Sequence, residues 1–219
     1  MKIEFLGHAC FLLTAEDGTR IVTDPYESGG LGGAVGYGPV GVDADAVTVS
    51  HGHGDHAHVE SVGGDPAVID AAAGGAVGSV RVRGVETWHD AAGGAQRGAN
   101  LVFVFEADGL RLAHLGDLGH ALVPDQMDAL GAVDVALVPV GGFYTIDAST
   151  AAAIADALGA RVTIPMHYKT EKLGFDIAPV SAFVELQPDR VRELGSSECE
   201  ITADTLPDRP EVWVLTPAR

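Results

Sequence analysis

The stretch AVTVSHGHGDHAH, residues 46–58, carries the strongest structural and chemical signal in the chain. Its first five residues are typical of a buried β-strand, and four of the nine histidines follow directly. In an extended segment, side chains at positions i and i+2 point to the same side, so His51 and His53 can hold one ion together. A glycine then permits a turn, after which Asp55 and His56 can present ligands to a neighbouring ion. Imidazole and carboxylate ligands suit Zn²⁺, and also Mn²⁺, Fe²⁺ or Ni²⁺.

A polar surface turn is the alternative interpretation of these histidines. For one isolated histidine in a loop, that interpretation would be preferred. The pattern H-x-H-x-D-H after a strand instead concentrates nitrogen and oxygen ligands at the spacing that a metal site requires. We therefore expect a metal centre here.

Short runs typical of β-strands dominate the rest of the chain, each bounded by Gly, Pro or Asp. Strands are predicted at residues 3–6, 11–14, 20–23, 46–50, 80–83, 101–105, 110–114, 133–138, 161–164 and 211–215. Helical periodicity is found at residues 124–130, 149–158 and 179–186, with Ser149 predicted to cap the second helix. Strands come first, followed by alternating strands and helices, which predicts a mixed α/β fold with helices covering sheets.

Acidic residues far outnumber basic ones, because 31 Asp and Glu against 13 Lys and Arg give a net charge of −18. Nucleic-acid binding needs clustered Lys and Arg that displace counterions from phosphates. We therefore expect no nucleic-acid partner, and no binding to an anionic membrane. No apolar run reaches the roughly 18 residues that a membrane span requires.

The length of 219 residues and a hydrophobic content of 47% predict one domain, residues 1–219, with a substantial core. Cys10 and Cys199 lie far apart and outside any C-x-x-C pattern, which favours free thiols and a cytoplasmic location. A homo-oligomer is compatible with the composition, although no interface stripe is evident.

The glycine-rich segment 28–41 lacks the ending of a phosphate loop, and a flexible surface loop is favoured over a lid above a substrate.

The order of histidines and aspartates along the chain resembles that of the metallo-β-lactamase-fold hydrolases. In that family H-x-H-x-D-H is followed by a histidine, a Gly-Asp pair and a late histidine, each at a strand end. The matching residues are His51, His53, Asp55 and His56, then His89 in ETWHD, Asp117 in HLGDLG and His167 in IPMHYKT. The resemblance covers about four-fifths of the chain. It is greatest for a branch of small metal-dependent hydrolases that also resembles L-ascorbate-6-phosphate lactonases.

The resemblance implies a four-layer αβ/βα sandwich of the α/β (α+β) class, with two divalent metal ions, Zn²⁺ foremost, at one edge of the sheets. It implies that one ion is held by His51, His53 and His89, the other by Asp55, His56 and His167, and that Asp117 bridges them. Asp55 and Asp117 are the expected catalytic residues. The implied reaction is hydrolysis of a small anionic ester, lactone or phosphoester by a hydroxide bound to the ions. Two divalent ions outweigh the nearby carboxylates, so the site would attract an anion despite the acidic surface.

Other residues are weaker candidates. His114 lies three residues before Asp117 and competes with His89 as a ligand, but only His89 fits the family order, so we expect His114 beneath the site. Asp24 matches an aspartate that orients the metal loop, and a turn residue is its alternative. Contacts with the site or the substrate are also expected for His8, Tyr144 and Lys169, the last as an anion anchor. For each of these three, a packed or solvated side chain is an equal alternative.

Two other functions are alternatives to hydrolysis. Related di-iron redox proteins have an acidic residue at the position of His53 and an added flavin domain, for which 219 residues leave no room. A metal-binding or interaction protein without turnover is the second rival, because a fold and a ligand set do not establish catalysis.

Overall fold

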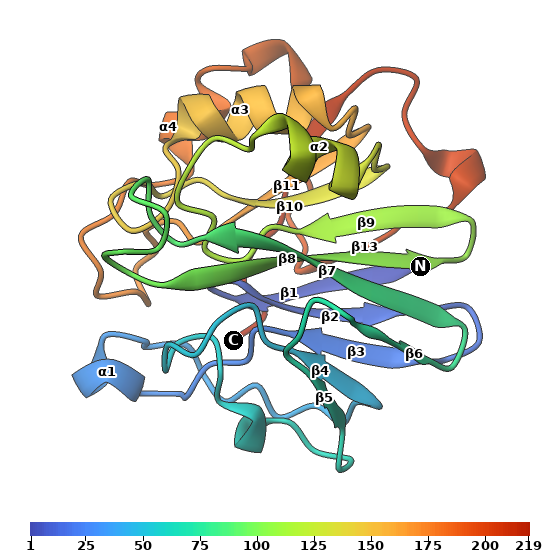
Figure 1. Ribbon diagram of the computed structural model, residues 1–219, viewed down its shortest axis with the longest axis vertical. Coiled ribbons are helices and arrows are strands. Elements are labelled where there is room, and N and C mark those ends of the chain that lie inside the picture. The colour runs from blue at the N-terminus through green and yellow to red at the C-terminus, as the bar shows by residue number, and fades with distance from the viewer.

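Two β-sheets packed against each other form the framework, and the computed structural model describes all residues from 1 to 219 (Figure 1). The smaller sheet has six strands in the order β13-β1-β2-β3-β4-β5, and the larger has eight in the order β12-β14-β11-β10-β9-β8-β7-β6. The smaller sheet comprises β1 (Lys2–Gly7), β2 (Cys10–Thr14), β3 (Arg20–Thr23), β4 (Ala46–Thr48), β5 (Ala67–Ile69) and β13 (Glu198–Glu200). The larger comprises β6 (Gly75–Val77), β7 (Val80–Trp88), β8 (Ala99–Ala107), β9 (Leu110–His114), β10 (Val135–Pro139), β11 (Val162–Met166), β12 (Val191–Glu193) and β14 (Glu211–Val214).

Helices lie outside the sheets. On the outer face of the larger sheet are α2 (Pro124–Leu130), α3 (Ala148–Ala157) and α4 (Ser181–Val184), while α1 (Gly30–Gly33) lies beside the smaller sheet (Figure 1). Short 3₁₀ turns occupy Val59–Ser61, Pro188–Arg190 and Ala203–Thr205. The predicted α/β sandwich is confirmed. No helix has the length and apolar character needed to cross a membrane.

All ten predicted strands are present, and the structure adds β5, β6, β12 and β13. Each added strand has three residues, which is too short for alternation to be detected in a sequence. The three predicted helices are also present, but the predicted cap of α3 is wrong. Asp147 caps this helix, because its carboxylate accepts the backbone N–H of Thr150 at 2.8 Å, two residues before the predicted Ser149.

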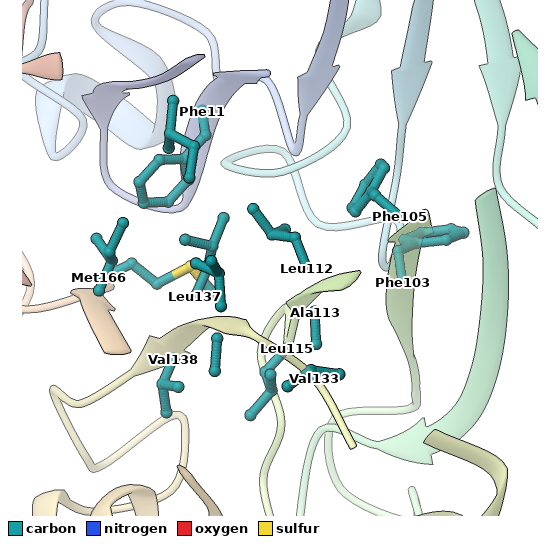
Figure 2. Packing of buried hydrophobic residues seen from close by; sticks show 14 of the residues in the cluster. Phe11, Phe103, Phe105, Leu112, Ala113, Leu115, Val133, Leu137, Val138 and Met166 are labelled. Carbon is teal, nitrogen blue, oxygen red and sulfur yellow. The ribbon is translucent and has the colours of Figure 1, made fainter. Parts of the chain in front are cut away.

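The core between the sheets follows from the alternation of apolar residues along the strands. Phe11 of the smaller sheet packs towards Leu112, Leu137 and Met166 of the larger one, and all four side chains are fully buried (Figure 2). Successive residues point to opposite faces, so Ala113 and Val138, the neighbours of Leu112 and Leu137, lie on the helix side (Figure 2). Each large apolar side chain buried in this way contributes about 1.5–3 kcal/mol.

A second apolar cluster of 14 buried residues covers the outer face of the smaller sheet, and the glycine-rich segment 28–41 contributes to it. Three of its side chains are buried: Val35, Tyr37 and Val40. The N–H of Gly36 donates to the carbonyl of Lys172 at 2.7 Å, and a Cβ on Gly36 would overlap that carbonyl. The segment therefore lies at the surface, as predicted, but three buried side chains and the Gly36 hydrogen bond anchor it to the sheet. Its tip is open, with Leu31 55% exposed.

Candidate metal centre

One edge of the two sheets collects the ends of six strands. Within each sheet the strands concerned run in the same direction, because two of them either pair in parallel or lie on either side of one antiparallel strand. The strands that end at this edge are β1, β3 and β4 of the smaller sheet and β7, β9 and β11 of the larger one. The residues that follow these ends are His8, Asp24, the segment 51–56, His89, Asp117 and His167. The topology thus brings together residues that lie up to 159 positions apart, from His8 to His167.

Three histidines form what we call the open group: His51, His53 and His89. Their ligand nitrogens all lie within 4.8 Å of one another. His51 Nε2 lies 3.0 Å from His53 Nδ1, and the backbone N–H of His89 donates to the carbonyl of Gly98. The histidine motif begins beyond the end of β4, so the loop rather than a regular strand juxtaposes His51 and His53. His53 is exposed and His89 is buried, which leaves this group accessible from one side.

Four residues form what we call the buried group: His8, Asp55, His56 and His167. Their ligand atoms also lie within 4.8 Å of one another, and all four side chains are buried. His8 Nε2 donates to Asp55 Oδ2 at 3.1 Å, and the ring centroids of His8 and His167 are 4.3 Å apart. His8, one of the weaker candidates, therefore lies within the site.

Asp117 lies between the two groups. Its Oδ2 is 3.3 Å from the Nε2 atoms of His56, His89 and His167, and 3.9 Å from that of His51. The preceding Gly116 has a φ of 55°, and a Cβ there would overlap Asn100 and Ser50. Glycine is therefore required before Asp117, which explains the Gly-Asp pair.

Opposing charges dominate the electrostatics of the site. Burial acts to raise the pKa of Asp117, but His167 and His56 outweigh it and hold that pKa well below the usual range. Burial lowers the pKa of His56, yet Asp117 and Asp55 raise it well above normal. Burial and then the charge of His56 lower the pKa of His51 to about 3, which leaves its imidazole neutral. Neutral imidazoles and ionised carboxylates are the states that bind metal ions, so the proton that Asp117 and Asp55 favour on His56 has to leave when an ion binds.

The unsatisfied polar atoms of the site support a fit to cations. His56 Nε2 and Asp117 Oδ1 are buried and have no hydrogen-bond partner. Buried polar groups are rarely left unpaired, since each costs free energy unless something satisfies it. Nitrogen and carboxylate donors that converge without partners fit divalent metal ions.

Asp24 orients the histidine at the centre of the buried group. Its Oδ2 accepts from His56 Nδ1 at 2.9 Å, which directs His56 Nε2 towards Asp117. Its two oxygens also accept from the backbone N–H and the hydroxyl of Ser50, and that hydroxyl lies 2.9 Å from His51 Nδ1. The Asp24 carboxylate therefore contacts His56 of the buried group directly and His51 of the open group through Ser50.

His114 lies below the site with both ring nitrogens engaged. Its Nε2 donates to the carbonyl of Ala9 at 2.8 Å, and its Nδ1 accepts the N–H of Gly116 at 3.2 Å. No nitrogen is left to point at the ligand groups, in agreement with the placement of His114 beneath the site.

Three residues around the centre have left-handed backbones, namely His8 (φ 57°), Asp24 (φ 40°) and His167 (φ 51°). Such conformations are uncommon outside glycine and cost about 1–3 kcal/mol each. They persist where the surroundings enforce them, as they do here: the N–H of His167 donates to the carbonyl of His8 at 2.9 Å. Sequence patterns give no signal for this strain.

A cavity of about 380 Å³ opens onto both groups. Tyr144 lines it, together with Leu31 and Phe175, which the sequence did not single out. Lys169 does not line it, because its ammonium donates to the carbonyl of Phe175 at 2.7 Å. The geometry therefore does not support Lys169 as an anion anchor. Arg97, also missed from the sequence, is the only Lys or Arg along the cavity wall.

Asp90, directly after His89, organises the loop that leads to Arg97. Its carboxylate accepts the backbone N–H groups of four residues at 2.7–3.0 Å: Ala92, Gly94, Gln96 and Arg97. Burial acts to raise the pKa of Asp90, but these hydrogen bonds lower it to about 2. An aspartate followed by a glycine pair is a turn signal that could have identified this loop.

Comparisons with known proteins place the chain in a family. Residues 2–167 match the model of a beta-lactamase superfamily domain. A UPF0173 metal-dependent hydrolase of Thermococcus kodakarensis is 30% identical over 205 residues, covering 78% of this chain and 85% of the relative. A UPF0173 metal-dependent hydrolase of Methanoregula boonei is 32% identical over 214 residues, covering 86% and 92%.

A solved structure extends the likeness to nearly the whole chain. It is a Thermotoga maritima protein described as a candidate Zn-dependent hydrolase of the metallo-β-lactamase superfamily, 42% identical with a TM-score of 0.80. The match covers 98% of this chain and 97% of that one. The chain therefore belongs to the metallo-β-lactamase superfamily, among its metal-dependent hydrolases.

Proposed function

We propose that the protein is a dinuclear metal-dependent hydrolase that acts on a small anionic ester, lactone or phosphoester. The observation that carries this proposal is the position of Asp117. One of its oxygens lies 3.3 Å from His89 of the open group and 3.3 Å from His56 and His167 of the buried group. A carboxylate shared by two sets of ligands suits a pair of ions about 3.5–4 Å apart.

The proposed ligands divide as the two groups do. The open group would hold one ion and the buried group the other, with Asp117 shared: His51, His53 and His89 on one side, and Asp55, His56 and His167 on the other. Two divalent ions, Zn²⁺ foremost, supply when bound a water of lowered pKa and a Lewis acid for developing negative charge.

The chain's own residues orient the ligands and handle the proton. Asp24 holds the ring of His56, and His8 holds the carboxylate of Asp55 through its Nε2–H. Burial raises the pKa of Asp55, but His56 and His8 keep it below normal, so the carboxylate is ionised at neutral pH. Because Asp55 lines the cavity, it can accept a proton from an attacking water.

The cavity sets the size of the substrate. A volume of about 380 Å³ accommodates a small molecule, and the rings of Tyr144 and Phe175 give it an apolar wall that limits water.

The net charge of −18 supports a small anion over nucleic acid or an anionic membrane as the partner. Two free cysteines support the proposed cytoplasmic location.

Elemental analysis and a substrate screen test the proposal. Protein purified without chelators should contain about two divalent ions per chain. The metal-loaded protein should hydrolyse at least one compound among phosphodiesters, lactones and thioesters, and Asp117→Ala should not. Activity that survives in Asp117→Ala, or a chain with two ions and no activity across the screen, would count against the proposal.

A further inference from the structure

We propose that Arg97 recognises an anionic group of the substrate, a carboxylate or phosphate placed beside the bond that is cleaved. The inference rests on the proposed hydrolytic function and names the residue that selects the substrate. Anion selectivity would then come from a side chain of this protein in addition to the charge of the bound metals.

Arg97 stands where two cavities meet. It lines the cavity over the metal centre together with Asp55, His89 and Asp117. It also lines a neighbouring groove of about 860 Å³, which runs past Trp88 and Leu101. Only His53 and Arg97 belong to both walls. A molecule whose reacting bond lies over the metal centre and whose remainder extends into the groove must therefore pass Arg97.

The guanidinium of Arg97 is free to bind a ligand. No protein acceptor forms a hydrogen bond or an ion pair with it, and only its backbone N–H is bonded, to Asp90. Three other cationic side chains are engaged: Arg83 and Arg111 donate to the carbonyl of Leu130, and Lys169 to that of Phe175. Arg97 is thus the one cation that offers unused donors to the cavity.

Two contacts restrain the position of Arg97. The guanidinium carbon lies 5.6 Å from the centroid of the Tyr144 ring, so one face is covered by an aromatic wall of the cavity. At its other end, the backbone of Arg97 is held by the Asp90 carboxylate, which closes the loop directly after His89. The same loop therefore sets the position of His89 and the position of Arg97.

A guanidinium positioned in this way selects for planar or multi-oxygen anions. It presents donors in a rigid fork that pairs with two oxygens of a carboxylate or phosphate at once. A lysine ammonium is a point charge without that fork, so it cannot reproduce the geometry. A neutral amide of equal size would lose the charge-assisted bonds and would bind more weakly.

Matched ligands test this role without requiring turnover. Phosphonoacetate and 3-phosphonopropionate each carry a phosphonate for the metal centre and a carboxylate for Arg97, whereas their carboxamides replace only the carboxylate. Isothermal titration calorimetry would compare each acid with its amide on zinc-loaded protein. The wild type should prefer at least one acid by roughly tenfold or more. Arg97→Gln should lose the preference, and Arg97→Lys should retain part of it.

Lys169→Gln is the matched control, since it removes the other nearby cation while keeping a donor for the carbonyl of Phe175. It should show the wild-type preference. Zinc content measured on every variant separates the two proposals. A wild type that holds zinc but binds acid and amide equally, or an Arg97→Gln protein that keeps the preference, overturns the role of Arg97 alone. A chain that binds no zinc overturns the proposed function as well, and the role of Arg97 with it.

Discussion

The two halves of the metal centre differ in how they are enclosed. In the buried group no residue is more than 7% exposed, although Asp55 and His167 line the cavity, and His56 is fixed by Asp24. In the open group His53 is exposed and lines two cavities. The ring of His51 contacts the hydroxyl of Ser50 through Nδ1 and the ring of His53 through Nε2. The same motif of six residues supplies both halves. Enclosure therefore depends on the surrounding loops, and it should make one ion hard to remove and the other exchangeable.

Asp117→Ala should have the largest effect, because it removes the one carboxylate that both groups share. We expect metal content after dialysis to fall from about two ions per chain towards none. Elemental analysis gives this number, and thermal unfolding shows whether the variant is folded. Asp128→Ala, which alters an exposed aspartate, is the control and should keep both ions. Two ions retained in Asp117→Ala would show that the groups bind independently of Asp117.

Replacing one histidine from each half should separate the two ions. His53→Ala should lose the ion of the open group and keep the other, so that about one ion per chain remains. His167→Ala should do the reverse. In the wild type, a chelator should remove the ion of the open group first, because water reaches His53. Release of both ions in a single phase, with both variants equally depleted, would contradict the difference in enclosure.

Supports behind the ligands should have smaller and separable effects. Asp24→Asn weakens the acceptor for His56 Nδ1, and we expect affinity for the ion of the buried group to fall about 10–100-fold. Ser50→Ala removes the hydroxyl beside His51 Nδ1 and should weaken the open group instead. Competition with a fluorescent chelator measures both affinities. Equal weakening of the two ions by each variant would mean that the halves are supported as one unit.

The sequence predicts the regular strands and the local metal motif better than the irregular loops. Regular strands have alternating apolar residues, so β1 and β9 are evident from the pattern alone. The H-x-H-x-D-H spacing predicts which side chains meet, and the structure brings His51, His53 and His56 to one edge. A metal motif is local in sequence, which is why reasoning from residues succeeds there.

The misses share a different physical origin. Arg97 lines the cavity at the end of a loop whose backbone is bonded to the Asp90 carboxylate, and such an irregular loop has no sequence period that would predict it. Lys169 is adjacent in sequence to the late metal motif, yet a nearby carbonyl captures its ammonium. The segment 28–41 has the composition of a loose loop, and its burial arises from a distant partner around Lys172. In all three cases, contacts between residues that are not neighbours in the sequence determine where the side chains lie.

The smallest predicted effect concerns the acid dependence of the loop behind the open group. Hydrogen bonds from the loop lower the pKa of Asp90 from 3.8 to about 2. A carboxyl whose pKa is lowered by folding stabilises the folded state above its unfolded pKa and loses that contribution as the pH falls. Asp90→Ala should therefore lower the melting temperature by a few degrees at pH 7, and the gap from wild type should narrow as the pH falls from about 4 towards 2.

Asp147→Ala is the matched control, because Asp147 also accepts a backbone N–H but caps α3 instead of the loop after His89. Both variants should melt earlier than the wild type at neutral pH. Only Asp90→Ala should also release the ion of the open group more readily, since only its loop carries His89. If both variants retain that ion equally well, the open group does not depend on the Asp90 loop, and its exposure must be attributed to His53 alone.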